Sequence, residues 1–482
     1  MSLKSKLESI AGKESVNVNG ALSKYATDES PFKGVVPNYE VKATTSVQVR
    51  EIINLARKEK TPVVPSSSTV HFNGAALSLQ GGIVIDLSGM NKIKTIDERN
   101  RKVIFEPGVT WGTLASELSS KDLRMFNPLF PHSGTSALTS LLEREPAIIP
   151  KFEYADPIMT LEAVLPNGEL MRTGSSSITL SYDKDDAAVD MVCPYGPGMD
   201  FFRLFHGAQG TLGVVTWVAV KLEHLSPLKK LFIISCSELE KAIRIVHSMQ
   251  NDMIGQECFI LDRNDAGLIL SRGDIARYGE LKNGLSNYNI IMVLRGGKRR
   301  PEEKIAYEEE ALREMLGKEL DGGDGVRSDD KNWMLENLGM NWPQGSVYWK
   351  NLLKGKVFQI AYKTTLKNID ILSTTFKKII TSNGFDINDC GLYVQPLEYG
   401  RAYHCEHHLY YAPEGEDFRK KLVSLYEELA VTLANKGAFF NQPYGPAVQA
   451  LFDKTGGYRE AVKKVKTIFD PAGIMNPGKL TF

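Results

Sequence analysis

The sequence predicts an α+β fold with more than one domain. Strand-length apolar runs alternate with helix-period segments between residues 46 and 118, a pattern typical of α+β or α/β domains. Residues 161–165 and 170–173 flank the turn residues Pro166, Asn167 and Gly168, and this predicts an antiparallel hairpin. At about 150 residues per domain, a chain of 482 residues predicts two to four domains.

The first regular elements follow an N-terminal polar extension. Ser46 is the expected N-cap of a helix over residues 47–59, in which apolar residues recur at helical spacing. A second helix is expected over residues 110–118, after Pro107 and Gly108 end a strand. The expected strands of this region are 61–65, 82–87 and 102–106.

The character of the sequence changes after residue 227. A strand over 230–235 and a helix over 237–250 are expected to begin a second domain. Residues 301–345 are charged and rich in glycine, and we expect them to form a long insertion or surface excursion. A helix is expected over 457–468, before a final tail.

Charge and composition exclude several classes of protein. The chain has 58 Lys and Arg against 58 Asp and Glu, which argues against binding to nucleic acid or to a membrane surface. We find neither an apolar run of the roughly 18 residues that a membrane span needs nor a secretory signal. Five dispersed cysteines without a C-x-x-C pair argue against a disulfide framework, a zinc ribbon or an iron–sulfur cluster. We expect a cytoplasmic protein with reduced thiols.

Four loops rich in small residues point to a large phosphate-bearing ligand. They lie at predicted strand ends and occupy residues 65–74, 106–112, 131–137 and 207–216. Small residues let backbone N–H groups approach a ligand, and their hydroxyls can bind phosphate oxygens. The G-x-G-x-x-G pattern of nicotinamide sites and the Gly-Lys-Ser/Thr pattern of P-loops are both missing from the sequence.

Taken together, the order of these motifs resembles a flavoprotein family. The matching segments are 63–65 with the serine turn, 83–90, 105–112, 156–174, 208–216 and 469–479. They are similar to the FAD-linked oxidases with a PCMH-type FAD-binding domain, the group of vanillyl-alcohol oxidase, p-cresol methylhydroxylase, glycolate oxidase and D-lactate dehydrogenase. The resemblance implies an α+β, two-subdomain FAD-binding domain, an α+β cap that carries the substrate site, and a C-terminus that returns to the FAD domain.

The same resemblance implies which residues bind FAD. Two loops match the pyrophosphate loops, residues near 210–215 match the flavin or adenosine contacts, and two residues lie on the returning segment. The serine turn replaces the usual glycine-rich turn, and hydroxyls can act as phosphate donors. The implied residues are Pro65, Ser66, Ser67, Ser68, Thr69, Val70, His71, Pro131, His132, Ser133, Gly134, Thr135, Ser136, Ala137, Gly210, Gly213, Val215, Asn476 and Lys479.

A histidine cluster supplies candidate catalytic residues. Residues 402–411 read as a strand, and period-two alternation places His404, Glu406 and His408 on one face and His407 on the other. Two imidazoles with a carboxylate between them can serve as a general base or bind a divalent metal. Arg401 beside them is a candidate carboxylate partner.

The resemblance argues against a metal at this cluster. The glycolate-oxidase branch carries a motif like H-x-G-D-G-N-x-H, which the spacing of His404 and His408 does not reproduce. We therefore expect no metal, and Tyr444 becomes a candidate for the substrate side. Some relatives bond FAD covalently through a histidine; His71 and His132 lie near the loops concerned, and we expect non-covalent FAD.

These observations favour an FAD-dependent dehydrogenase that acts on the CH–OH group of an alcohol or 2-hydroxy acid. His404 or His408 is the expected base, Arg401 the anion anchor, and an electron-transfer flavoprotein or iron–sulfur subunit the external electron acceptor. The alternatives are a phenolic or aryl-alcohol oxidase and a non-catalytic FAD-binding subunit of a larger complex; a homo-oligomer is also possible. The expected domains are an extension over 1–35, the FAD domain over 36–226, the cap over 227–430 and the returning segment over 431–482.

Overall fold

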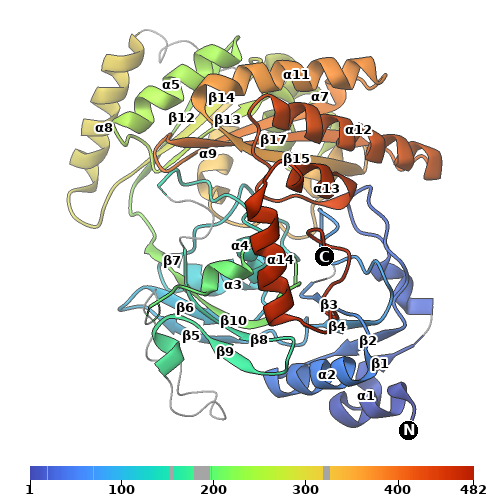
Figure 1. Ribbon diagram of the computed structural model, residues 1–482. Helices are drawn as coiled ribbons and strands as arrows, with labels where there is room; N and C mark the ends of the chain where they lie inside the picture. The colour runs from blue at the N-terminus through green and yellow to red at the C-terminus, as the bar shows by residue number, and fades with distance from the viewer. Residues whose placement is uncertain (19, 69, 152–156, 179–195, 197, 318–325) are drawn as a thin grey trace.

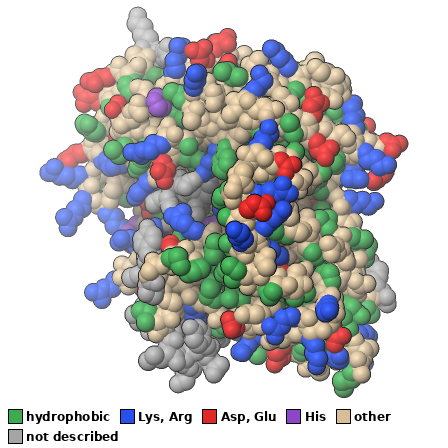
Figure 2. Space-filling model, in the orientation of Figure 1, with side chains coloured by type: hydrophobic (Ala, Val, Ile, Leu, Met, Phe, Trp, Pro, Cys, Tyr) green, Lys and Arg blue, Asp and Glu red, His purple; other side chains and the backbone are tan. Residues whose placement is uncertain are grey.

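We analysed a computed structural model of the chain (Figure 1). It describes residues 1–18, 20–68, 70–151, 157–178, 196, 198–317 and 326–482. Basic and acidic side chains are interspersed over the face shown in Figure 2, in keeping with their equal numbers in the sequence. The expected α+β fold class is confirmed, because the described residues form a parallel-containing sheet, two large antiparallel sheets and helices packed on them.

The first sheet is small and contains the three parallel strands of the N-terminal region. Its order is β1-β2-β4-β3, with β1 antiparallel to β2. These strands are β1 (Val16–Asn17), β2 (Tyr39–Lys42), β4 (Ile83–Asp86) and β3 (Val63–Ser66). Helices α1 (Leu3–Ala11) and α2 (Ser46–Glu59) pack together on this sheet around a shared apolar cluster. The N-cap of α2 is Thr45, whose hydroxyl accepts from the N–H of Gln48, so the prediction of Ser46 was wrong by one residue.

The second sheet is antiparallel and adjoins the first. Its order is β5-β6-β10-β8-β9. The strands are β5 (Ile93–Asp97), β6 (Lys102–Phe105), β10 (Val214–Lys221), β8 (Ile158–Val164) and β9 (Leu170–Arg172). The predicted hairpin is the pair β8–β9. Helices α3 (Trp111–Ser119) and α4 (Ala137–Leu142) share its apolar core, and β7 (Leu123–Arg124) pairs with β11 (Glu223–His224) beside it.

The third sheet forms the upper half of the molecule in Figure 1. All six strands are antiparallel, in the order β12-β14-β13-β16-β17-β15. The strands are β12 (Lys229–Cys236), β14 (Tyr288–Arg295), β13 (Glu257–Asp262), β16 (Cys390–Leu397), β17 (Ala402–Tyr411) and β15 (Lys356–Thr364). The sheet carries a large apolar cluster on each face, so every strand except the edges is buried on both sides.

Helices cover both faces of this six-stranded sheet. One face packs against α5 (Leu239–Asn251), α8 (Pro301–Leu316), α11 (Ile369–Ser382) and α12 (Glu416–Asn435). The other face packs against α6 (Arg263–Leu270), α7 (Ile275–Gly284), α9 (Ser328–Asn337) and α10 (Trp349–Leu352). Residues 301–345 are therefore more than a surface excursion: buried Leu312 of α8 and Met334 of α9 belong to the two cores.

The C-terminal segment returns to the first sheet. Helices α13 (Val448–Phe452) and α14 (Gly457–Phe469) lead from the six-stranded sheet down the molecule (Figure 1). The backbone N–H of Val63 then donates to Ile474 at 2.8 Å, and the N–H of Asn476 donates to Val63 at 2.8 Å. The chain end thus extends the edge at β3, next to the loop predicted to bind FAD.

Candidate active site

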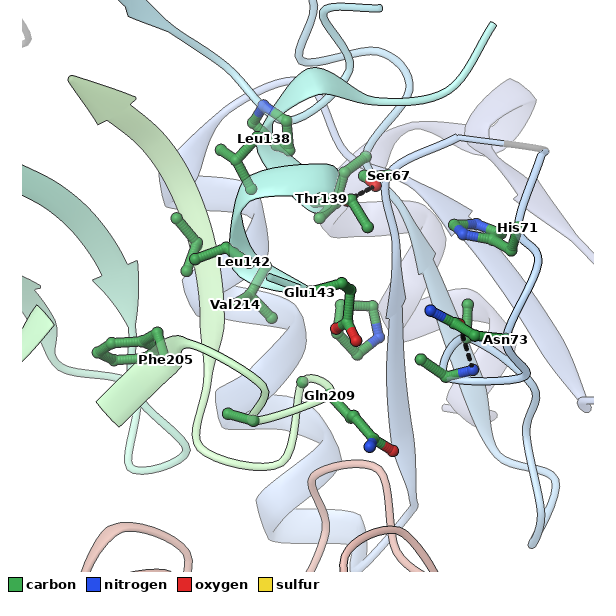
Figure 3. A pocket seen from close by; sticks show the side chains of 18 of the residues that line it. Ser67, His71, Asn73, Leu138, Thr139, Leu142, Glu143, Phe205, Gln209 and Val214 are labelled. Atoms are coloured by element: carbon green, nitrogen blue, oxygen red, sulfur yellow. Dashed lines mark hydrogen bonds between the residues drawn. The ribbon is translucent and has the colours of Figure 1, made fainter. Parts of the chain in front are cut away.

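A cavity lies where the first two sheets meet (Figure 3). Three main segments line it: the loop after β3, helix α4 with the residues on either side of it, and residues 205–215, which lead into β10. Small side chains form much of the wall, including Ala75, Ala76, Ala208, Gly210 and Gly213. Such a wall lets an extended ligand approach the backbone closely.

The geometry of this cavity fits a phosphate-bearing cofactor. The hydroxyls of Ser67 and Thr139 meet across the loop and helix that line the cavity (Figure 3). The Oγ1 atom of buried Thr135, also on the wall, has no hydrogen-bond partner among the described residues. A buried hydroxyl without a partner is costly unless a ligand or water satisfies it. These donors match what FAD requires.

Asn476 and Lys479 hold the cavity loops together from the C-terminal segment. The Nδ2 of Asn476 donates to the carbonyls of Ala75 at 3.0 Å and Gln209 at 2.6 Å. The Nζ of Lys479 donates to the carbonyl of Gly74 at 2.7 Å. Burial lowers the pKa of Lys479 to about 8, with Asp28 and Glu143 opposing the shift. Both residues therefore position the loops, and neither is among the lining residues of the cavity itself.

The structure brings part of the predicted FAD set to this cavity. The predicted residues that line it are Pro65, Ser67, Val70, His71, Thr135, Gly210, Gly213 and Val215. Ser66 and Ser68 instead donate to the carbonyls of Ser68 and Val70 within the turn. Ser136 caps α4, Ala137 is buried in the second-sheet core, and Thr69 lies outside the described residues. Ser133 and Gly134 belong to the turn after His132.

His71 is held by its own loop. Its Nε2 lies 2.7 Å from the carbonyl of Ser68 and 3.3 Å from the hydroxyl of Ser66. Burial lowers the pKa of His71, although Asp28 and the Ser68 carbonyl act in the opposite direction. A neutral imidazole fixed in this way forms part of the wall.

A second pocket, of about 530 Å³, adjoins the cavity and carries charged groups. Phe72, Thr135 and Glu145 line both spaces. Four aromatic side chains shape the second pocket: Phe72, Tyr348, Trp349 and Tyr393. Its polar lining comes from the loop after β7 and from the six-stranded sheet, and consists of His132, Thr135, Glu145, Lys350, Gln359, Tyr393, Glu406 and His408.

A chain of buried charges lies along this pocket. Lys350 of α10 donates to Glu406 of β17 at 2.7 Å. Glu406 also lies 2.7 Å from Nε2 of His408, and Nδ1 of His408 lies 2.7 Å from Asp265 of α6. Burial opposes ionisation of Glu406, but Lys350 and the hydrogen bonds from His404 and His408 hold its pKa well below the usual range. Glu406 is therefore a carboxylate.

The histidines of β17 divide as the alternation predicts. Burial lowers the pKa of His408, and so does Lys350, but the charge of Asp265 and the hydrogen bonds to Asp265 and Glu406 together outweigh them, so the net shift is upward. His404 lies 3.2 Å from Glu406 and its pKa is lowered, mainly by burial. His407 faces the other side of the sheet, where it stacks on Phe376 with ring centroids 3.9 Å apart.

Two predicted site residues, Arg401 and Tyr444, line neither the first cavity nor the second pocket. Arg401 occupies the turn before β17, where its exposed side chain donates to the carbonyl of Glu398. The turn directs Arg401 to solvent, and Arg401 is not among the residues that line the second pocket. Tyr444 donates to Glu143, which lines the first cavity, and Tyr444 itself lines neither space.

Sequence reasoning missed Lys350, Asp265, Glu143 and Glu145. No local pattern in the sequence marks any of these four residues. In the part of the chain that the structure describes, no group of three or more His, Cys, Asp or Glu side chains is arranged to hold a metal ion. None of the described helices is long and apolar enough to cross a membrane.

Comparisons with known proteins agree with this geometry. Residues 37–174 match the model of an FAD-binding domain. The chain is 24% identical to the glycolate oxidase subunit GlcD of Bacillus subtilis, over 99% of this chain and 96% of that protein. It is also 24% identical to D-2-hydroxyglutarate dehydrogenase of Stutzerimonas stutzeri, over 95% and 94% of the two chains.

Solved structures share the fold across the whole chain. The 4-ethylphenol oxidase of Gulosibacter chungangensis, in complex with isoeugenol, superposes with a TM-score of 0.84 at 17% identity, covering 99% of this chain and 96% of its own. For p-cresol methylhydroxylase with substrate bound, the TM-score is 0.81 at 18% identity, over 99% and 96% of the chains. Residues 37–174 thus form an FAD-binding domain, and the chain is a flavoprotein. The chain is similar to FAD-linked oxidases with a PCMH-type FAD-binding domain, and it is an FAD-dependent oxidoreductase acting on CH–OH groups.

Proposed function

We propose that the chain oxidises a 2-hydroxy acid that carries an aromatic or bulky apolar side group, bound in the second pocket. Lys350 carries this proposal: among the described lining residues it is the one lysine or arginine, and aromatic rings surround it. A carboxylate substrate needs a cation, and a flat apolar group packs well on aromatic walls. The full-length relatives named above act, by their names, on glycolate and D-2-hydroxyglutarate.

In this proposal FAD occupies the first cavity and the substrate occupies the second pocket. The small-residue loops and Thr135 would hold FAD, which supplies the acceptor for the hydride of the substrate carbon. Lys350 would bind the substrate carboxylate, and Glu406 with His408 would hold Lys350 in place. We assign cofactor binding to residues 36–226 and 431–482, and the substrate wall to residues 227–430 together with the side of residues 36–226 that carries Phe72, His132 and Glu145, with residues 1–35 as an N-terminal extension.

We also infer that FAD is bound non-covalently and is reoxidised by an external acceptor. His71 supports the first point, because its Nε2 is already bonded to the Ser68 carbonyl. The printed names of two relatives, the glycolate oxidase subunit and the 4-cresol dehydrogenase flavoprotein subunit, support a partner protein. An electron-transfer flavoprotein or an iron–sulfur subunit fits that role. Acid precipitation tests the linkage, since non-covalent FAD stays in the supernatant.

Anaerobic flavin reduction tests the substrate assignment. We expect mandelate or 3-phenyllactate to bleach the flavin absorbance faster than lactate or glycolate. Lys350→Met is expected to raise the KM for the hydroxy acids and to leave the KM for benzyl alcohol unchanged. Reduction by 4-ethylphenol, with none by any hydroxy acid, would refute the proposal in favour of a phenol-oxidising enzyme, which the aromatic lining would then explain.

A further inference from the structure

Glu145 occupies the junction between the two spaces of the site. Glu145 follows α4 and lines both the first cavity and the second pocket, which we propose to be the substrate pocket. Its backbone N–H donates to the carbonyl of Ser140 at 3.0 Å, which fixes the end of α4. The neighbouring Pro146 lines the substrate pocket and limits backbone movement. A carboxyl at this position lies between the space that we propose for FAD and the space that we propose for the substrate.

The acid–base groups of β17 are already engaged by other side chains. Both ring nitrogens of His408 lie 2.7 Å from carboxylates, of Asp265 and Glu406, and its pKa is raised. Because each ring nitrogen already lies against a carboxylate, neither is free to take a proton from the substrate. Glu406 is held as a carboxylate by Lys350 and the two histidines, so it is a poor base. His404 bonds to Glu406 and does not line the substrate pocket.

Glu145 differs from these groups in its surroundings. Burial raises its pKa to about 7, and the positive charge of Lys350 and a hydrogen bond to Ser140 limit the rise. The negative charges of Glu406 and Glu143 act in the same direction as burial. The titratable groups that face it are Lys350, Glu406, Glu143, Tyr348 and Tyr444, with His132 and His408 on the same pocket wall. A base poised near neutral pH is the most effective kind for an alcohol oxidation.

We propose that Glu145, rather than His404 or His408, accepts the hydroxyl proton of the substrate. This inference rests on the proposed function. As the substrate O–H bond breaks, its proton goes to the Glu145 carboxylate. The C–H bond breaks with both electrons leaving as hydride to FAD, and a C=O bond forms, so the product is the 2-oxo acid. The neutral Glu145 carboxyl then releases its proton to solvent before the next turnover.

The rate of flavin reduction against pH tests this role. In the parent enzyme we expect the anaerobic second-order rate of flavin reduction, measured at mandelate concentrations well below KM so that it reports the free enzyme, to rise through about pH 7. Glu145→Gln should lower the rate by roughly 100- to 10,000-fold and abolish that rise, while Glu145→Asp should keep the rise at a reduced rate. Glu169→Gln, which changes an exposed carboxyl, is the matched control and should behave as the parent.

Two further variants should move the midpoint in opposite directions. Because the charge of Lys350 lowers the pKa of Glu145, Lys350→Met should shift the midpoint to higher pH. Because the charge of Glu406 raises it, Glu406→Gln should shift the midpoint to lower pH. A structural role for Glu145 would predict neither shift.

Infrared difference spectroscopy adds a measurement that needs no turnover. The carbonyl band of a protonated carboxyl should disappear with a midpoint near pH 7 in the parent protein and be missing in Glu145→Gln. A Glu145→Gln enzyme with parental rate and pH profile would overturn the inference and leave the proposed function standing. If no hydroxy acid reduces the parent flavin, the proposed function and the inference both fail, even where the infrared band titrates.

Discussion

Replacing Asn476 by alanine should weaken FAD binding through the cavity loops. The Nδ2 of Asn476 joins the carbonyl of Ala75 to that of Gln209, and both of these residues line the cavity. The side chain is 1% exposed, so the substitution leaves two buried carbonyls without their donor. Each unsatisfied group costs about 1–3 kcal/mol, which gives a loss of about 2–4 kcal/mol in the free energy of unfolding once water enters part of the space.

Part of the lost free energy of unfolding should also appear as weaker binding of FAD. The two loops are free to separate without Asn476, and FAD must then restore their arrangement on binding. If about 1.4 kcal/mol is transferred in this way, the Kd for FAD rises about tenfold. The measurement is the fluorescence of FAD released on dilution of the holoprotein, together with urea unfolding of the same samples.

Asn289→Ala supplies the matched control. Asn289 of β14 is fully buried and its Nδ2 donates to the Ser286 carbonyl at 3.0 Å, but it lies in the six-stranded sheet and lines neither space of the site. It should lose stability and keep the parental Kd for FAD. An Asn476→Ala protein that loses stability with an unchanged Kd would refute the argument that the C-terminal segment preorganises the cavity.

Two other predictions concern buried charges. Burial raises the pKa of Glu145 from 4.5 to about 7, so the folded state holds a proton that the unfolded state releases, and stability falls as pH rises from 4.5 to 7. Urea unfolding should therefore show Glu145→Gln to be more stable than the parent above pH 7, by up to about 3 kcal/mol, with equal stabilities near pH 4.5; equal stabilities at pH 8 would contradict this. Glu257 of β13 is fully buried between Arg124 of β7, at 2.5 Å, and Arg295 of β14, at 2.7 Å. Glu257→Gln removes the carboxylate that pairs with buried Arg295 and leaves buried Arg124 paired with Glu223 alone. The substitution should cost about 3–5 kcal/mol in the free energy of unfolding at pH 7, a loss that Glu169→Gln should not show.

The strand pattern was the most predictable part of the site. Successive side chains of any strand alternate between its faces, so residues 402–411 alone separate Glu406 and His408 from His407. The same argument could not place Arg401, because alternation applies only within the strand and Arg401 precedes it in a turn. A residue at a strand end takes its direction from the turn.

Local sequence patterns could not identify the partners of Glu406 and His408. Lys350 is 56 positions from Glu406, and Asp265 is 143 positions from His408, so only the packing of α10 and α6 on the six-stranded sheet brings them together. The serine turn shows a different limit. Serine hydroxyls can donate to nearby backbone carbonyls. Ser66 and Ser68 do so within the turn, and Ser67 is the serine of this turn that lines the cavity.

In our proposal, Lys350 binds the substrate and Glu145 accepts its proton. The charge of Lys350 links these two steps. Lys350 contacts Glu406 directly and acts on Glu145 through its charge, as well as facing the pocket. A substrate carboxylate that binds Lys350 neutralises part of the charge that holds the pKa of Glu145 down. Substrate binding then makes Glu145 a stronger base at the moment when a hydroxyl proton has to be removed. An alcohol without a carboxylate would lack this effect, so the preference for hydroxy acids should appear in the rate of flavin reduction as well as in affinity.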